Sequence, residues 1–289
     1  MVIANPIYDV VFKRMMENER VARFFIGTLL DETIENVEVK PQEFTYTDEL
    51  AGLAVFRLDF IATIKTASGE SKKVLIEIQK AKNQIDLMRF RNYLGEQYKK
   101  EDKINDEKVI LPITTIYILG FKLTEIDTAC IKVQRNYKDL INNKIINTKS
   151  DFVEKLTHDS FIVQVDRITD RYQTKLDKLL SVFEQTNFID SNKITKQYKH
   201  NTDIEEVKII TDILHHTGTD PDEKKKIEVE QEAWRTVNAM FEDKERELLK
   251  ALSEKDKAIS EKDKALSEKD VALSKMAEEM QALRRRLGE

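Results

Sequence analysis

The strongest candidates for chemistry in this sequence are acidic and amide side chains on two neighbouring apolar segments. Glu77 and Gln79 are two residues apart in the segment KKVLIEIQ, and Asp59 interrupts the segment VFRLDFIATI. Because side chains two residues apart share one face of a β-strand, Glu77 and Gln79 are expected to point the same way. If the connection between the segments turns about Ser68, Asp59 lies opposite Glu77. The spacing therefore predicts two facing carboxylates.

Facing carboxylates repel each other unless a proton, a basic group or a cation lies between them. A divalent metal ion is the simplest solution, and carboxylate oxygens suit Mg2+ or Mn2+, which keep several waters and accept phosphate oxygens. Such an ion polarises a phosphodiester and lowers the pKa of a bound water. Gln79 or Lys80 could position that water or stabilise the developing negative charge. The alternative is a pair of partly exposed edge-strand carboxylates without a metal.

Other kinds of metal site have little support in the sequence. A single cysteine, Cys130, excludes an intramolecular disulfide and a cysteine-based zinc site. The four histidines are His158, His200, His215 and His216. Because adjacent residues do not share a helix face, the pair at 215 and 216 does not predict a zinc site.

The elements that must position these residues alternate between strand and helix. Runs typical of strands cover 34–45, 55–64, 72–79, 109–121 and 161–165, and helical spacing covers 7–30, 83–100, 175–184 and 203–237. The polar segment KTASGES is expected to join the two strands of interest as a β-hairpin. The first helical stretch is expected to divide near Glu17, 101–108 to form a loop and 190–201 to form a linker. The pattern predicts a mixed α/β domain.

A seven-residue repeat fills the end of the chain. From Lys250 to Ala277 the blocks KALSEKD, KAISEKD, KALSEKD and VALSKMA follow one another. Heptad position a holds Leu252, Ile259, Leu266, Leu273, Met280 and Leu287, and position d holds Lys255, Lys262 and Lys269 before Met276 and Leu283. This predicts a coiled coil through which the protein associates with itself. The alternative is a mostly solvated single helix.

Composition limits the remaining functional classes. With 289 residues and 40% hydrophobic content, the chain can form a sizeable domain and an appendage. The net charge of -5 means that any DNA contact must use a local basic face. The sequence shows neither an apolar run of membrane-spanning length nor a signal peptide, so we expect a cytoplasmic protein without a membrane partner.

Several motifs together resemble the PD-(D/E)XK nuclease family transposases, relatives of the Rpn recombination-promoting nucleases. They are NPIYDVVFKRMM, Asp59, the strand exit VLIEIQKAK, the helix MRFRNYLGEQY and the strand ILPITTIYILGF, in that order. The resemblance covers residues 5–125 well and 126–235 loosely. It implies a restriction-endonuclease-like mixed sheet flanked by helices. The expected parts are a nuclease-like domain at 1–190, a helical connector at 191–240 and a coiled coil at 241–289.

The resemblance also implies a function, a Mg2+-dependent DNA endonuclease associated with transposition or recombination. Asp59 and Glu77 would be metal ligands, with Asp9 as a third. Gln79 would take the place of the lysine found in the wider superfamily. Because Gln79 carries no positive charge, Lys80 or another base would have to compensate, or activity is weakened. On a regular strand, however, Lys80 points to the opposite face.

Arg89 and Tyr93 are candidates for contacts with the DNA backbone. They are four residues apart on the predicted helix after the active strand, so they share a face. A solvated helix face is the alternative. Two other functions stay open: a catalytically weak or inactive nuclease fold that acts as a coiled-coil DNA-binding or scaffold protein, and a ribonuclease.

Overall fold

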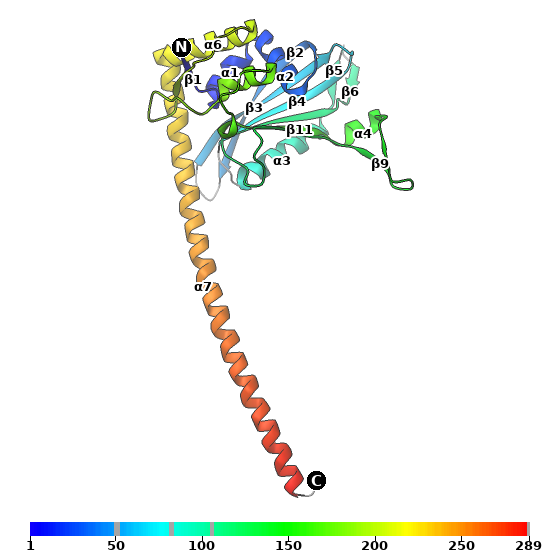
Figure 1. Cartoon of the computed structure of the whole chain (residues 1–289), viewed down its shortest axis with the longest axis vertical. Helices are drawn as coiled ribbons and strands as arrows, with labels where there is room; N and C mark the ends of the chain where they lie inside the picture. Colours follow the sequence, from blue (N-terminus) through cyan, green and yellow to red (C-terminus); the bar gives the residue numbers. More distant parts are fainter. Residues whose placement is uncertain (49–52, 81–83, 105–106, 288–289) are drawn as a thin grey trace. The chain divides into compact units, whose positions relative to one another are not determined.

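A six-stranded mixed sheet lies at the centre of the first of two compact units, Met1–Ala233 (Figure 1). The computed structural model describes residues 1–48, 53–80, 84–104 and 107–287. The strand order is β2-β3-β4-β7-β11-β8. These strands are β2 (Ile34–Asp48), β3 (Leu53–Thr66), β4 (Ser71–Gln79), β7 (Ile113–Leu119), β8 (Cys130–Val133) and β11 (Asp159–Gln164). The pairs β4–β7 and β7–β11 are parallel, and the other pairs are antiparallel.

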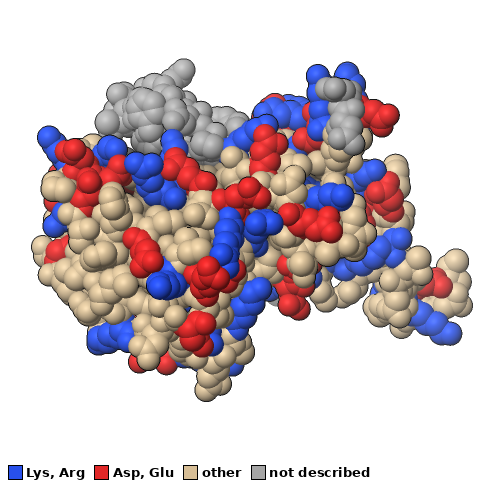
Figure 2. All heavy atoms as spheres, turned by 90° about the horizontal axis from the view of Figure 1, so that it is seen from above, with Lys and Arg blue, Asp and Glu red and all other residues tan. Residues whose placement is uncertain are grey.

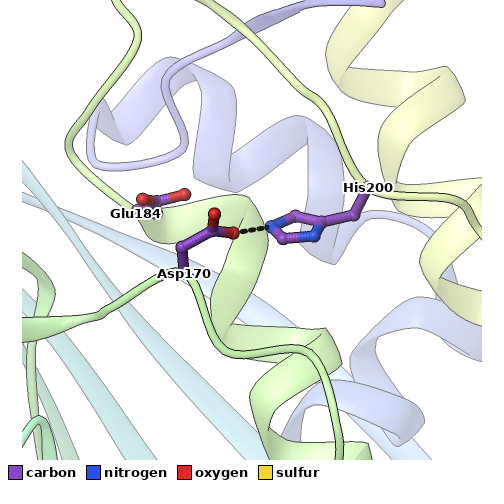
Figure 3. A group of neighbouring side chains, drawn as sticks. All are labelled: Asp170, Glu184 and His200. Atoms are coloured by element: carbon purple, nitrogen blue, oxygen red, sulfur yellow. Dashed lines mark ion pairs between the residues drawn. The ribbon is translucent and has the colours of Figure 1, made fainter.

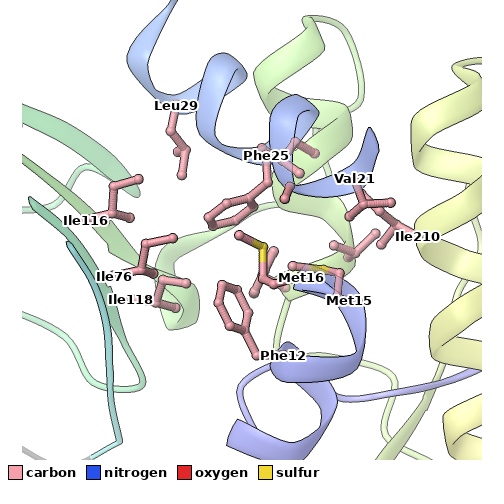
Figure 4. Close-up of a cluster of buried hydrophobic side chains, with 14 of the residues drawn as sticks. Phe12, Met15, Met16, Val21, Phe25, Leu29, Ile76, Ile116, Ile118 and Ile210 are labelled. Carbon is pink, nitrogen blue, oxygen red and sulfur yellow. The ribbon is translucent and has the colours of Figure 1, made fainter. Parts of the chain in front are cut away.

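Helices cover both faces of the sheet, which confirms the predicted mixed α/β class. On one face the core joins the sheet to α1 (Asp9–Met16), α2 (Glu19–Leu30) and α6 (Glu205–Thr219) (Figure 4). The rings of Phe12, Phe25 and Phe60 meet edge-on there. A second, smaller cluster joins α3 (Gln84–Lys99) to the other face. The sheet therefore has two differently covered sides.

The first helical stretch divides where it was predicted to divide. Asn18 begins α2, and its side chain accepts a hydrogen bond from the Val21 N–H at 3.1 Å. Asparagine is a favoured residue at this position because its side chain satisfies a backbone donor that the helix leaves unpaired. The apolar residues of both helices face the sheet, as the spacing predicted.

The β3–β4 hairpin forms with the expected register. Phe60 pairs with Ile76 and Lys65 with Ser71, which is the pairing that a turn about Ser68 requires. At the turn, the Gly69 N–H donates to the Thr66 carbonyl at 2.9 Å. Gly69 has a φ of 87°, a left-handed conformation that glycine adopts without steric cost.

Two polar segments differ from the prediction. The predicted loop at 101–108 carries the antiparallel strands β5 (Asp102–Ile104) and β6 (Glu107–Val109). The predicted linker at 190–201 carries β12 (Thr195–Gln197). This strand pairs with β1 (Val2–Ala4), which is distant in sequence. Strands β5, β6 and β12 lack a run of alternating apolar residues, so the alternation that predicts strands does not detect them.

The rest of the unit consists of short elements between longer ones. They are β9 (Tyr137–Asp139), β10 (Lys144–Ile146), α4 (Asp151–Leu156), η1 (Val165–Arg167), α5 (Lys175–Leu180) and η2 (Ser181–Phe183). Residues 191–233, assigned by sequence to a connector, contribute β12, α6 and the start of α7 (Pro221–Leu287) to this unit. They join it because α6 packs against β1, α1 and α2.

The second unit, Trp234–Glu289, is the remainder of α7. Its apolar heptad residues are exposed along the helix, among them Leu252, Ile259, Leu266, Leu273 and Met280. The heptad segment is thus helical, as predicted. Its self-association stays a prediction, since this structure holds one chain.

Candidate metal centre

Glu77 is a buried carboxylate on a central strand. It is 1% exposed, and β4 has a hydrogen-bonded neighbour on each side. The alternating residues Ile76 and Ile78 belong to the core beneath α1 and α2, whereas Leu75 belongs to the cluster beneath α3. By alternation, Glu77 faces the α3 side. A carboxylate this far from water is stable as an anion only where hydrogen bonds or positive charge compensate for its lost hydration.

Asp59 lies on the strand next to Glu77. The β3–β4 register ends at Phe60 with Ile76, one step before Asp59 and Glu77. The facing of the two carboxylates across the strands therefore stays a prediction. The Asp59 side chain lies outside the described part of the structure, so its role as a ligand stays a prediction.

The negative charge of Glu77 acts on a neighbouring ring. Tyr117 pairs with Glu77 across the parallel β4–β7 ladder and packs against the cluster beneath α3. The pKa of Tyr117 is raised, first by burial and further by the charge of Glu77, while a hydrogen bond to Thr115 opposes the shift. The phenol therefore stays protonated and remains a hydrogen-bond donor at neutral pH.

Gln79 ends β4 on the same face as Glu77. It is half-buried and pairs with Leu119 of β7. Together with Glu77 it offers an amide oxygen and a carboxylate oxygen, the donor types that Mg2+ and Mn2+ prefer. The chemistry of these two donors fits a hard divalent cation.

Lys80 and the start of α1 meet at Glu230, near the beginning of α7. The Lys80 ammonium forms an ion pair with Glu230 and lies 4.6 Å from the centre of the Tyr8 ring. The Glu230 carboxylate also accepts hydrogen bonds from the N–H groups of Asp9 and Val10, at 2.9 and 3.1 Å. A carboxylate at a helix N-terminus is stabilised by the unpaired N–H groups and by the helix dipole.

The predicted site residues therefore form two groups. Glu77 and Gln79 share the α3 face, whereas the contact of Lys80 with Tyr8 places its ammonium beside the core under α1 and α2. This agrees with the expected direction of Lys80 on a regular strand. Sequence reasoning did not identify Glu230, which is 150 residues from Lys80 and lies in no recognisable motif.

The two residues predicted to contact DNA lie on α3. Tyr93 is buried and packs against Phe90 and Leu75, at a ring-centre distance of 6.4 Å from Phe90. In this conformation the ring belongs to the cover over the Glu77 face and not to the surface, because the apolar side of α3 faces the sheet. The Arg89 side chain lies outside the described residues.

A second group of metal-ligating side chains lies on loops away from the sheet. Asp170, Glu184 and His200 converge so that one donor atom of each lies within 4.8 Å of the others (Figure 3). The His200 Nε2 is 3.2 Å from Asp170, and the imidazole stacks on Tyr172 at 4.5 Å. Sequence patterns do not identify this group, because its members are separated along the chain and follow no ligand spacing.

Comparisons with family models, curated proteins and solved structures find no match to this chain. Within the described residues, no helix combines the length and apolar character needed to cross a membrane.

Proposed function

We propose that the first unit is a Mg2+-dependent DNA endonuclease with a restriction-endonuclease-like sheet, acting in transposition or recombination. The observation that carries this proposal is the buried Glu77 carboxylate on a central strand, with Asp59 on the neighbouring strand β3. The motif resemblance between residues 5 and 125 supports the same function. Mn2+ is the alternative ion, since it accepts the same oxygen ligands.

Each residue of the proposed site has a chemical part. Asp59 and Glu77 would hold the ion, which when bound polarises the phosphodiester and activates a water. The Gln79 amide orients that water by hydrogen bonding. Because Lys80 is engaged by Glu230, it acts in this proposal by holding the start of α1 in place rather than by replacing the missing lysine at position 79.

The proposal is tested by metal titration and plasmid cleavage with the full chain. Asp59→Ala and Glu77→Ala are expected to lower both metal affinity and cleavage. Glu38→Gln, an exposed glutamate on β2, is the matched control and should change neither. Unchanged metal binding and cleavage in both alanine variants would disprove the nuclease. Metal binding without cleavage would favour the scaffold function, and cleavage of matched RNA alone would favour a ribonuclease.

We also propose that the heptad segment associates with a second copy of the chain. The supporting feature is the continuous stripe Leu273, Met276, Met280 and Leu283, which is exposed on a single helix. Exposed apolar stripes of this kind are characteristic of association surfaces.

Deleting residues 245–289 should convert an oligomer into a monomer by light scattering. The substitution Leu273→Glu with Met280→Glu should do the same without shortening the helix. An unchanged mass in both variants would refute the coiled coil.

A further inference from the structure

A β-hairpin arm projects from the edge of the main sheet and has no role in the proposed metal centre. We define the arm as residues 132–149, which include β9 and β10 (Figure 1). Among the strands that the structure describes, these two pair only with each other, and Tyr137 is matched with Ile146 at the base of the ladder. The following helix, α4, has no buried residue. An isolated two-stranded hairpin is marginally stable in water, so the arm needs an anchor.

The anchor is Arg135 at the base of the arm. Its guanidinium donates to Asp159 of β11 at 2.8 Å, to Glu154 of α4 at 2.6 Å and to the Thr157 carbonyl at 2.8 Å. The Tyr137 hydroxyl adds a hydrogen bond to Glu154 at 2.5 Å. These bonds fix the direction of the hairpin relative to the main sheet.

The tip of the arm is closed by hydrogen bonds and carries apolar side chains. The Asp139 carboxylate accepts hydrogen bonds from the Ile141 and Asn142 N–H groups at 2.8 and 3.2 Å. The hydrogen bond from the Asn142 side chain, together with these two backbone hydrogen bonds, lowers the pKa of Asp139. The ionised Asp139 carboxylate is therefore bonded within the turn. Leu140 and Ile141 are 86% and 93% exposed, at the end of a segment held in one conformation. Two large aliphatic side chains so fully exposed indicate a binding surface.

The arm is basic in an acidic protein. It contains four lysines, Lys132, Lys138, Lys144 and Lys149, and one acidic residue, Asp139, besides Arg135, whose charge is paired with Glu154 and Asp159. Four minus one gives a net charge of +3 for the lysines and Asp139, against -5 for the whole chain. The four lysines are exposed. Elsewhere, over the face shown in Figure 2, positive and negative side chains are interspersed. The arm therefore supplies the local basic element that contact with a polyanion requires.

We infer that this arm binds duplex DNA, with its lysines at the phosphates and Leu140 and Ile141 against the bases. A two-stranded β-ribbon fits the major groove, where apolar side chains contact thymine methyl groups. The lysines extend along the ribbon, as phosphates extend along a groove, and exposed apolar side chains lie on β10 (Ile145 and Ile146) as well as at the tip. The inference rests on the proposed function for its choice of DNA as ligand.

The test is fluorescence anisotropy with a labelled duplex in EDTA, so that binding is measured without cleavage. Lys138→Gln with Lys144→Gln should weaken binding at least about ten-fold at 0.1 M salt. The slope of log affinity against log salt should fall by roughly 1.8, about 0.9 for each lost phosphate contact. The matched control is Lys208→Gln with Lys225→Gln, two exposed lysines on α6 and α7, and it should bind as the unaltered chain does.

The tip is tested separately by Leu140→Ser with Ile141→Ser. This variant should lose affinity and keep the salt slope, because it removes base contacts and no phosphate contact. Both side chains are exposed, so folding should be unaffected, which circular dichroism checks. Equal binding by the arm variants and the control would overturn the inference, as would arm-dependent binding to anionic vesicles with no affinity for the duplex.

The outcomes separate this inference from the proposed function. Arm-dependent DNA binding in a chain that cleaves nothing with Mg2+ or Mn2+ would retain the arm and reject the nuclease. Metal-dependent cleavage with arm-independent binding would retain the nuclease and reject the arm.

Discussion

Glu77 on β4 and the group Asp170, Glu184 and His200 are two ways of placing cation ligands in one domain. Glu77 is 1% exposed and its backbone is fixed by strands on both sides. Asp170 lies on a loop with its side chain 83% exposed, and its carboxylate is 3.2 Å from the His200 Nε2. In the loop group, donor atoms lie close together. At Glu77, burial has removed water from a carboxylate, and its negative charge must be compensated by other groups. Burial, and not closeness alone, marks the stronger candidate.

A basic residue strengthens this contrast. Lys196 is buried beside Glu184, and its ammonium donates to the Glu184 carbonyl at 2.5 Å. Burial lowers the pKa of Lys196 to about 7, although the charge of Glu184 opposes the shift. A neighbouring ammonium repels a cation, so the loop group is expected to bind a metal more weakly than the strand pair does.

The largest effect should come from the isosteric change Glu77→Gln. Removing one charge at the proposed centre is expected to lower the rate of Mg2+-dependent plasmid cleavage by on the order of 10²–10³-fold, the usual effect of losing a preorganised electrostatic contact. Asp170→Asn is the matched change in the loop group. If Asp170→Asn lowers the rate as much as Glu77→Gln, the ranking of the two groups is reversed.

The next effect concerns stability and pH. Because the folded pKa of Lys196 is about 7 and its ordinary value is 10.5, the unfolded chain binds the extra proton between these values. The contribution of Lys196 to the free energy of unfolding therefore rises from pH 7 to pH 9, by about 2–3 kcal/mol. Urea unfolding of the unaltered chain and Lys196→Met at both pH values gives this difference. A Lys196→Met variant with the same pH dependence as the unaltered chain would contradict it.

A smaller effect is expected at Gln79. Gln79→Ala removes the amide that orients the water and leaves Asp59 and Glu77 in place, so cleavage should fall about ten-fold while metal affinity changes little. Isothermal titration calorimetry and a cleavage assay separate these quantities. Equal losses of affinity and rate would instead make Gln79 a metal ligand.

The smallest effect is expected at the loop group itself. His200→Ala should leave plasmid cleavage unchanged, because none of the three residues of this group lies on β3 or β4. The loop group should bind Mn2+ or Zn2+ weakly, and calorimetry in the Glu77→Ala background measures this affinity. A metal affinity in that background equal to that of the unaltered chain would assign the bound ion to the loops.

The parts of this molecule that were predictable depend on local patterns. The β3–β4 hairpin and its register follow from alternating apolar residues and a turn centred on Ser68, all within a short stretch of chain. Strand β12 was not predictable, since its polar residues pair with Val2–Ala4, which are distant in sequence. The loop group and Glu230 were missed for the same reason. Such contacts between distant parts of the sequence leave no periodic signal.

The burial of Tyr93 shows another limit. Its spacing from Arg89 correctly places the two residues on one face of a helix, but spacing alone cannot say whether that face meets solvent or a second cluster of the core. The decision depends on how α3 packs over Leu75 and Tyr117, which is a property of the assembled sheet.

The position of Glu230 has a practical consequence for dividing the protein. The Glu230 carboxylate, which accepts hydrogen bonds from the first turn of α1, belongs to α7, the helix that also carries the heptads. The domain therefore ends inside α7. A fragment stopped at residue 190 would lack β12, α6 and the acceptor for the Asp9 and Val10 N–H groups. The shortest fragment expected to retain the native domain ends at or after Ala233, partway along a continuous helix.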